Sequence, residues 1–216
     1  MSVRALKWEL PYATVVLTIF EVAAYYTGTS PSLALPMPLG DARWWRTFTS
    51  IFAHADGSHL ASNMVAQVFL LSLLEVDAGT AAATYLYLAS GLCGSLAQAI
   101  VYDGSPTILL GASGAVFGLI GGHMGTLLLN CDRWRAPVLF ALSLLYIANE
   151  IQLAANTHSH VARHAHLIGA LSGFTNGILL TVNIHKEAWE GYARWIAGVS
   201  SIVILIVLSI LYVMYG

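Results

Sequence analysis

The chain alternates between long apolar runs and short clusters of polar residues. Seven of the runs approach the roughly 20 residues that a helix needs to cross a bilayer core of about 30 Å. They cover residues 11–27, 59–74, 79–102, 113–130, 136–153, 164–182 and 195–215. The pattern predicts an all-α fold, a polytopic bundle of transmembrane helices. Because the connections are too short for an extramembrane domain and no repeat or Pro-rich linker divides the chain, we expect a single domain over residues 1–216.

One connection is much longer than the others. Residues 28–58 contain three prolines and the sequence Trp44-Trp45-Arg46. A connection of this length normally has its own structure, so we expect local elements within it. The two tryptophans suit the membrane interface, and anchoring there would explain both of them without any further role.

The composition excludes a soluble enzyme. Of the 216 residues, 57% are hydrophobic and 9% are charged, against about 25% charged residues in an average soluble domain. The net charge is −2 and no basic run exceeds two residues, which argues against nucleic acid as a partner. Cys93 and Cys131 lie far apart and without Cys-x-x-Cys spacing, so we expect neither a disulfide framework nor a zinc site.

The positive charges predict the orientation in the membrane. Seven spans leave Arg4, Lys7, Arg133, Arg135, Lys186 and Arg194 on one side of the bilayer and Arg43, Arg46 and Arg163 on the other. The positive-inside rule places the larger group, and with it the N-terminus, in the cytoplasm. We expect the first run to be retained rather than cleaved as a signal peptide, because Glu21 interrupts it.

Polar residues at membrane depth are costly unless they are paired or hydrated, so they mark candidate sites. His59 and Asn63 are four residues apart and share one face near the start of the second run. Their side chains can form hydrogen bonds on the same side of the helix. A helix cap, or a bridge between two helices, explains this pair equally well.

Ser113 lies between small residues in Gly111-Ala112-Ser113-Gly114, directly before an apolar run. Small neighbours let a peptide approach the hydroxyl, and free N–H groups at a helix start can face an oxyanion. The glycines at 114, 118 and 122 also form a face of small residues for helix packing. Packing alone is the alternative interpretation of this motif.

His166 lies one turn before Gly169 and shares a face with Gly169, Gly173 and Gly177. Such a face of small residues lets two helix backbones approach closely. If it meets the helix that carries Ser113, the imidazole reaches the serine hydroxyl, and a serine beside an imidazole is an activated nucleophile. A histidine without that partner would more often be structural.

Other polar residues give weaker signals. No Lys or Arg shares the depth of Glu21 and Glu150, which favours buried structural hydrogen bonds over a proton relay. Histidines cluster at 158, 160, 164 and 166, yet no His-Glu-x-x-His motif or intramembrane carboxylate joins them, so metal catalysis is a minor alternative and we expect no metal. Nothing else in the sequence indicates a cofactor. Asp103 and Asp132 lie at opposite ends of one apolar stretch, which argues against a paired-aspartate protease.

The ordered motifs resemble those of the rhomboid intramembrane serine proteases. They are Trp45-Arg46 in the long connection, His54 with His59 and Asn63, Gly111-Ala112-Ser113-Gly114, and Ala165-His166 followed by Gly169 and Gly173. Any one of these motifs is common in membrane proteins, whereas four in this order are specific. The resemblance implies a rhomboid-like six-helix core at roughly 8–185 and an additional C-terminal span at roughly 195–215, which is the arrangement of secretase-type eukaryotic members.

The resemblance also implies a function and roles for single residues. Ser113 would be the nucleophile and His166 its base, while Asn63 and His59 would stabilise the oxyanion. The expected substrates are single-pass transmembrane proteins, with growth-factor precursors among them, cleaved within or near their membrane segment. The expected location is the secretory pathway or the plasma membrane. The alternatives are a catalytically silent rhomboid-like protein that binds clients and a small multi-pass transporter.

One position departs from the family pattern. Family members often carry tyrosine four residues after the serine, and this chain has Phe117. The ring face that would pack on His166 is kept, and the phenolic oxygen is lost. Trp45 and Arg46 are family-typical, and we expect both to be structural.

Overall fold

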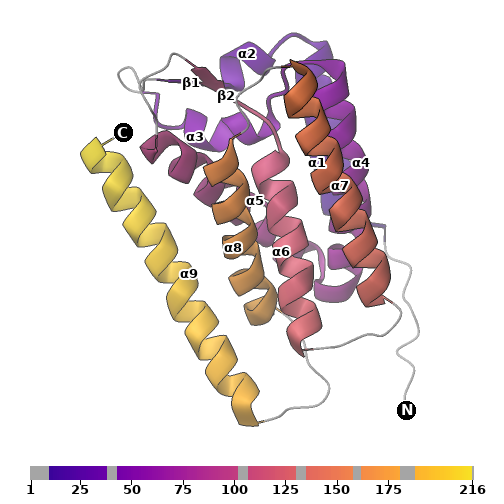
Figure 1. Cartoon of the computed structure of the whole chain (residues 1–216), viewed down its shortest axis with the longest axis vertical. Helices are drawn as coiled ribbons and strands as arrows, with labels where there is room; N and C mark the ends of the chain where they lie inside the picture. Colours follow the sequence, from indigo (N-terminus) through magenta and orange to yellow (C-terminus); the bar gives the residue numbers. More distant parts are fainter. Residues whose placement is uncertain are drawn as a thin grey trace.

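Each predicted apolar run forms a helix in the computed structural model, which describes residues 10–37, 43–101, 107–129, 135–157, 162–180 and 188–215. The long helices are α1 (Tyr12–Tyr26), α4 (Gly57–Ala78), α5 (Thr80–Ile100), α6 (Ser113–Leu129), α7 (Arg135–Thr157), α8 (Arg163–Leu180) and α9 (Ala188–Tyr215). Consecutive long helices run in opposite directions and form one bundle (Figure 1). The all-α prediction and the places of the seven runs are confirmed, although α9 begins at Ala188 rather than at residue 195.

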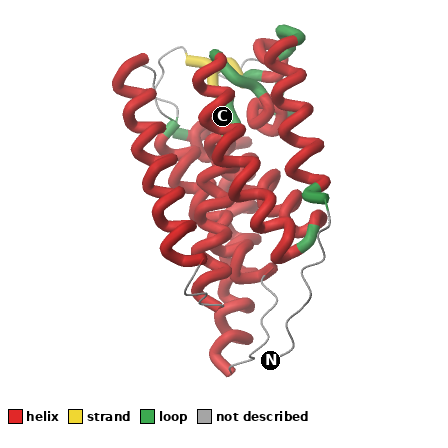
Figure 2. Tube along the Cα trace, turned by 90° about the vertical axis from the view of Figure 1, so that its right-hand side faces the viewer, coloured by secondary structure: helices red, strands yellow, loops and turns green. Residues whose placement is uncertain are grey.

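The long connection has structure of its own, as expected. It contains α2 (Ser30–Leu33), β1 (Leu35–Met37), α3 (Arg46–Thr49) and the short 3₁₀ helix η1 (Ser50–Phe52). β1 pairs antiparallel with β2 (Thr107–Leu109), and the two strands lie at one end of the bundle (Figure 2). This small sheet was not predicted, because a three-residue strand has too few residues to show a period.

Glu75, near the end of α4, holds the start of α1. Its carboxylate accepts hydrogen bonds from the backbone N–H groups of Ala13 (2.8 Å) and Thr14 (3.1 Å). These groups lie in the first turn of α1, where a helix offers them no acceptor of its own. A negative side chain also complements the positive end of the helix dipole. Glu75 therefore fixes one end of α1 against α4.

The most extensive helix–helix contact joins α6 and α8. Glycines make it possible, because a Cβ atom on any of three α8 glycines would overlap a backbone carbonyl of α6. The overlapping pairs are Gly169 with Gly114, Gly173 with Gly118, and Gly177 with Gly122. The two faces of small residues that the sequence predicts therefore pack directly on each other.

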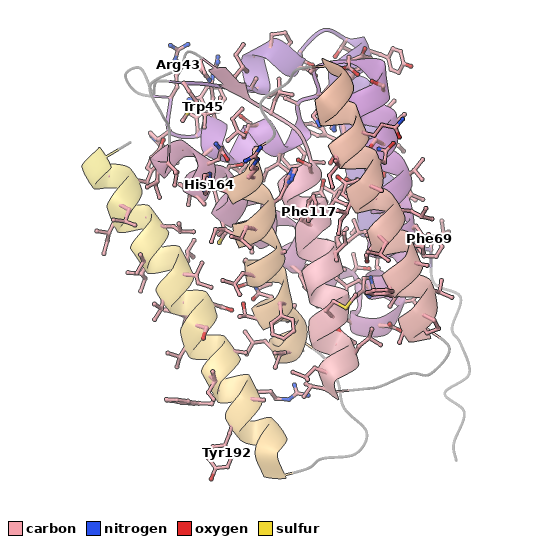
Figure 3. All side chains as sticks on the ribbon, in the orientation of Figure 1. Arg43, Trp45, Phe69, Phe117, His164 and Tyr192 are labelled. Atoms are coloured by element: carbon pink, nitrogen blue, oxygen red, sulfur yellow. The ribbon has the colours of Figure 1, made fainter. Side chains whose placement is uncertain are left out.

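Large apolar side chains cover the outside of the bundle. Among the most exposed are Val65 on α4, Leu145 on α7, Leu167 on α8 and Val213 on α9, and Figure 3 shows Phe69 of α4 pointing away from the other helices. Within the described ranges, α4 and the Gly191–Val213 part of α9 have the length and apolarity to cross a membrane. Shorter apolar helices are formed by α1, α6 and the Ala136–Asn149 part of α7. Such a surface suits contact with lipid rather than water.

Candidate active site

Ser113 and His166 face each other where α6 and α8 begin. The Oγ atom of Ser113 lies 2.9 Å from Nε2 of His166. Ser113 is buried and His166 is half-buried. The glycine contacts between the two helices bring these side chains within hydrogen-bond distance. A serine hydroxyl paired with an imidazole nitrogen at this distance has the geometry of an activated nucleophile and its base.

Phe117 packs flat against the imidazole of His166. The two ring centroids are 4.2 Å apart and the planes are inclined by 18°. Figure 3 shows Phe117 on α6, toward the end of the bundle that holds His164. A stacked ring restricts the rotation of the imidazole without donating or accepting a hydrogen bond. The ring contact expected at this position is present, and the ring contributes no hydroxyl.

The first turn of α6 presents backbone N–H groups that have no acceptor within the helix. The N–H of Val116 donates to the carbonyl of Ala112, so the N–H of Ser113 lies before the first hydrogen bond of the helix. Gly111 has a φ of +120°, and an added Cβ would lie 2.7 Å from Cε1 of His59. Glycine is therefore required here on two grounds, and the His59 ring lies directly against the loop that carries the serine.

Asn63 follows His59 by one turn on the same face of α4 and is fully buried. Its Nδ2 donates to the backbone carbonyl of His59 at 2.8 Å. Its Oδ1 accepts from the hydroxyl of Tyr146 on α7, at 3.1 Å. Tyr146 was not predicted from the sequence, because a lone tyrosine in an apolar run does not indicate which residue it contacts.

His54 is buried in the connection that precedes α4. Its ring meets the ring of His59 edge to face, with centroids 5.3 Å apart. Burial, and then the neighbouring His59, lower the pKa of His54 to about 3, so this imidazole is neutral at physiological pH. The charge nearby is Asp56, which caps α4 by accepting the N–H of His59 at 2.8 Å. Hydrogen bonds from Ser58 and from this N–H lower the pKa of Asp56.

Trp45 and Arg46 organise the long connection. The guanidinium of Arg46 lies over the Trp45 ring, 5.2 Å from its centroid, and donates from Nη1 to the carbonyl of Ala34 at 3.1 Å. Figure 3 shows Trp45 near the end of the bundle where the strands lie. These contacts fit the structural role expected for both residues.

Glu21 is part of a buried hydrogen-bond network away from the serine. The hydroxyl of Tyr87 lies 2.9 Å from Oε1 of Glu21 and 2.6 Å from Oε1 of Gln67. This network fits a structural role for Glu21 better than a role in a proton relay. Gln67 continues the spacing of His59 and Asn63 by one more turn, and that spacing could have revealed it.

The remaining sequence candidates divide into two groups. His164 is described and exposed. Residues 103, 131, 132, 158 and 160 and the side chain of residue 150 lie outside what the structure describes. In the described part of the chain, no three His, Cys, Asp or Glu side chains gather closely enough to bind a metal ion.

Fold and site together define a class: a helical bundle with an apolar outer surface that holds a serine–histidine pair at one end. Comparison with known proteins gives the family. The family model described as Rhomboid domain matches residues 41–183. The chain belongs to the rhomboid family, and it is a polytopic helical membrane protein. All four ordered motifs, from Trp45-Arg46 onward, lie within the matched residues.

Individual relatives agree with this assignment. RHOMBOID-like protein 1 of Arabidopsis thaliana is 36% identical over 138 residues, which cover 64% of this chain and 35% of the relative. RHOMBOID-like protein 7 of the same plant is 33% identical over 146 residues, covering 68% and 45%. Rhomboid-related protein 3 of Homo sapiens is 25% identical over 213 residues, covering 86% and 52%. The chain thus spans about a third to a half of the length of these relatives.

Proposed function

We propose that this protein is an intramembrane serine endopeptidase that works with a catalytic dyad of Ser113 and His166. The observation that carries the proposal is the 2.9 Å distance between Oγ of Ser113 and Nε2 of His166. The position of the serine in the first turn of α6, where backbone N–H groups have no acceptor within the helix, supports it further. Membership of a family whose members are typically intramembrane serine proteases agrees with it.

The mechanism follows from the order of groups around the serine. Nε2 of His166 takes the hydroxyl proton while Oγ of Ser113 bonds to the carbonyl carbon of the substrate peptide. The negative oxygen that results is stabilised by the amide of Asn63, by His59 and by the N–H of Ser113. His166 then gives its proton to the departing amine, which leaves an ester on Ser113. Water, deprotonated by His166, attacks this ester, and His166 returns that proton to Oγ of Ser113 as the ester bond breaks. The serine is restored, and the carboxylic acid that leaves ionises to the new carboxylate.

The substrate must expose a peptide bond to a buried serine. In a helix each peptide bond is shielded by its own hydrogen bonds and by side chains, so the substrate helix has to unwind locally. Gly residues weaken a helix, and the small side chains of Gly and Ala let other groups approach its backbone, so segments containing them are the expected targets. We propose single-pass transmembrane proteins as substrates, growth-factor precursors among them, cleaved within or near the membrane segment.

The domain and location belong to the same proposal. We propose one domain over residues 1–216, with a six-helix core at roughly 8–185 and α9 as the additional span of secretase-type rhomboids. The excess of Lys and Arg on one side supports a cytoplasmic N-terminus. The serine then lies toward the outer face of a secretory or plasma membrane.

A cleavage assay in proteoliposomes tests the function. The protein is reconstituted with a labelled single-pass substrate whose membrane segment contains Gly and Ala, and the products are located by mass spectrometry. Cleavage by the wild type, and its loss in both Ser113→Ala and His166→Ala, is the expected result. His164→Ala is the matched control, because His164 lies on the same helix turn as His166 but is exposed.

Two outcomes would refute the proposal. Full cleavage by Ser113→Ala would mean that another group is the nucleophile. A folded wild type that cleaves no substrate would favour a client-binding protein or a transporter. Solute flux across the liposome membrane, unchanged by Ser113→Ala, would then identify the transporter.

A further inference from the structure

Two neighbours fix the orientation of the Asn63 amide. Its Nδ2 faces the backbone carbonyl of His59, which can only accept a hydrogen bond. The nitrogen must therefore point to that carbonyl, and Oδ1 points to Tyr146. Because a carboxamide oxygen also only accepts, the hydroxyl of Tyr146 is the donor. Hydrogen-bond chemistry thus permits a single placement of the amide oxygen and nitrogen.

Tyr146 is itself held in place by the rings around the dyad. It is 7% exposed, and its ring centroid lies 5.5 Å from that of Phe117. Phe117 in turn stacks on His166 at 4.2 Å. Tyr146, Phe117 and His166 therefore form a row of three rings that connects the amide of Asn63 with the base of the dyad.

Phe117 lacks the hydroxyl that a tyrosine would carry at this position. Phe117 supplies only a ring face, and the phenol that reaches the site comes instead from α7, through Tyr146. Its hydroxyl bonds to Asn63. The side chain that carries the phenol and the side chain that stacks on His166 are thus two different residues in this protein.

Oxyanion stabilisation depends on this orientation. An amide that donates to a negative oxygen must present N–H, because a rotated amide would present Oδ1 and repel the charge. One Nδ2 hydrogen is used by the His59 carbonyl, and the amide carries a second. A donor that is already oriented costs no reorganisation when the negative charge forms.

We propose that Tyr146 is a positioning residue for catalysis, which acts by holding the Asn63 amide in the orientation that donates to the oxyanion. The inference rests on the proposed protease function. It also connects α7 to the oxyanion site, because Tyr146 is the residue of that helix that bonds to Asn63.

Steady-state cleavage by Tyr146→Phe tests the inference, since this variant keeps the ring and removes only the hydroxyl. We expect kcat to fall roughly tenfold, the factor that one hydrogen bond is worth, with KM unchanged. Direct removal of the donor in Asn63→Ala should cost more, about 10²–10³ in kcat. In the Asn63→Ala background, Tyr146→Phe should cause no further loss, because its effect passes through Asn63.

Two controls make the comparison specific. Tyr85→Phe removes a hydroxyl from an exposed tyrosine of α5, and its kcat should equal that of the wild type. Phe117→Leu removes the ring stacked on His166, and the loss that it still causes in the Asn63→Ala background measures the part that acts through the base rather than through Tyr146 and Asn63. Thermal unfolding checks that each variant is folded. Labelling of Ser113 by a fluorophosphonate in membranes gives a second rate for any variant that is unstable in detergent.

The outcomes separate the inference from the function on which it rests. If Ser113-dependent cleavage is present and Tyr146→Phe keeps its full kcat, the inference is wrong and the protease function stands. An equal loss from Tyr146→Phe with and without Asn63 would overturn it as well, because Tyr146 would then act by another route. Absence of Ser113-dependent cleavage in the wild type overturns both.

Discussion

Tyr87 belongs to a buried network in which the number of available hydrogen atoms limits which groups can donate hydrogen bonds. Its hydroxyl lies within hydrogen-bond distance of both Glu21 Oε1 and Gln67 Oε1, and a phenol has one hydrogen to donate. We expect Glu21 to supply the second hydrogen as a neutral carboxylic acid. This form would leave no charge at a side chain that is fully buried, whose Oε2 has no hydrogen-bond partner in the described part of the chain.

The hydrogen count predicts the effect of substitutions at Glu21. Glu21→Gln retains a neutral group of the same shape and should lower the stability by less than about 1 kcal/mol. Glu21→Leu leaves Tyr87 and Gln67 with an unsatisfied contact and should cost about 1–3 kcal/mol. Thermal unfolding in detergent compares the two variants. Equal losses from both would show that the network needs a charged carboxylate instead.

At the scale of the elements, the contact between α6 and α8 decides whether the dyad forms. Both helices begin with a dyad residue in or next to their first turn, and the glycines behind these residues let the backbones touch. Interhelical packing in membranes is driven largely by such close approach of small residues. The distance between Ser113 and His166 is therefore set by glycines that take no part in the chemistry.

Gly173→Ala tests this dependence. An added methyl group would overlap the carbonyl of Gly118, so the helices must separate, at a cost of about 1–3 kcal/mol or more. We expect a lower unfolding temperature and loss of Ser113-dependent cleavage. Gly191→Ala is the control, because an added Cβ there meets no atom within 4 Å. Wild-type behaviour of Gly173→Ala would contradict the role given to this contact.

The parts of the fold that the sequence predicted are those that depend on long patterns. Seven apolar runs indicated the seven long helices, and the four-residue spacing of glycines indicated the two faces that meet. The β1–β2 pair and the short helices of the long connection contain only a few residues each, so they show no periodic pattern of apolar residues that would predict them. Tyr146 was missed for a related reason: its contact with Asn63 joins two helices, and a lone tyrosine in an apolar run does not indicate its partner.

At the scale of the whole molecule, consecutive long helices run in opposite directions, so successive connections lie at opposite ends of the bundle. The described arginines of the smaller group, Arg43, Arg46 and Arg163, lie toward the end with the strands and the serine, as Figure 3 shows for Arg43. Arg194 lies near the start of α9, and the neighbouring Tyr192 marks the opposite end. The placement agrees with the two groups of charges from which the orientation is proposed.

Single cysteines at the two ends test that orientation. In a chain with Cys93 and Cys131 replaced by alanine, Ser32→Cys lies in the exposed part of α2 and Tyr192→Cys at the far end. A membrane-impermeant maleimide should label the cysteine at residue 32 in intact cells. The cysteine at residue 192 should react only after permeabilisation. The reverse pattern would place the serine on the cytoplasmic side.

The central claim is that Ser113 is activated by His166, and labelling by a serine-reactive fluorophosphonate tests it most directly. The probe needs no substrate, and mass spectrometry locates the modified residue. The account predicts modification at Ser113 in the wild type, in membranes or mild detergent, and none in Ser113→Ala or His166→Ala. Folded wild-type protein that remains unlabelled at Ser113, or equal labelling after removal of His166, would contradict it.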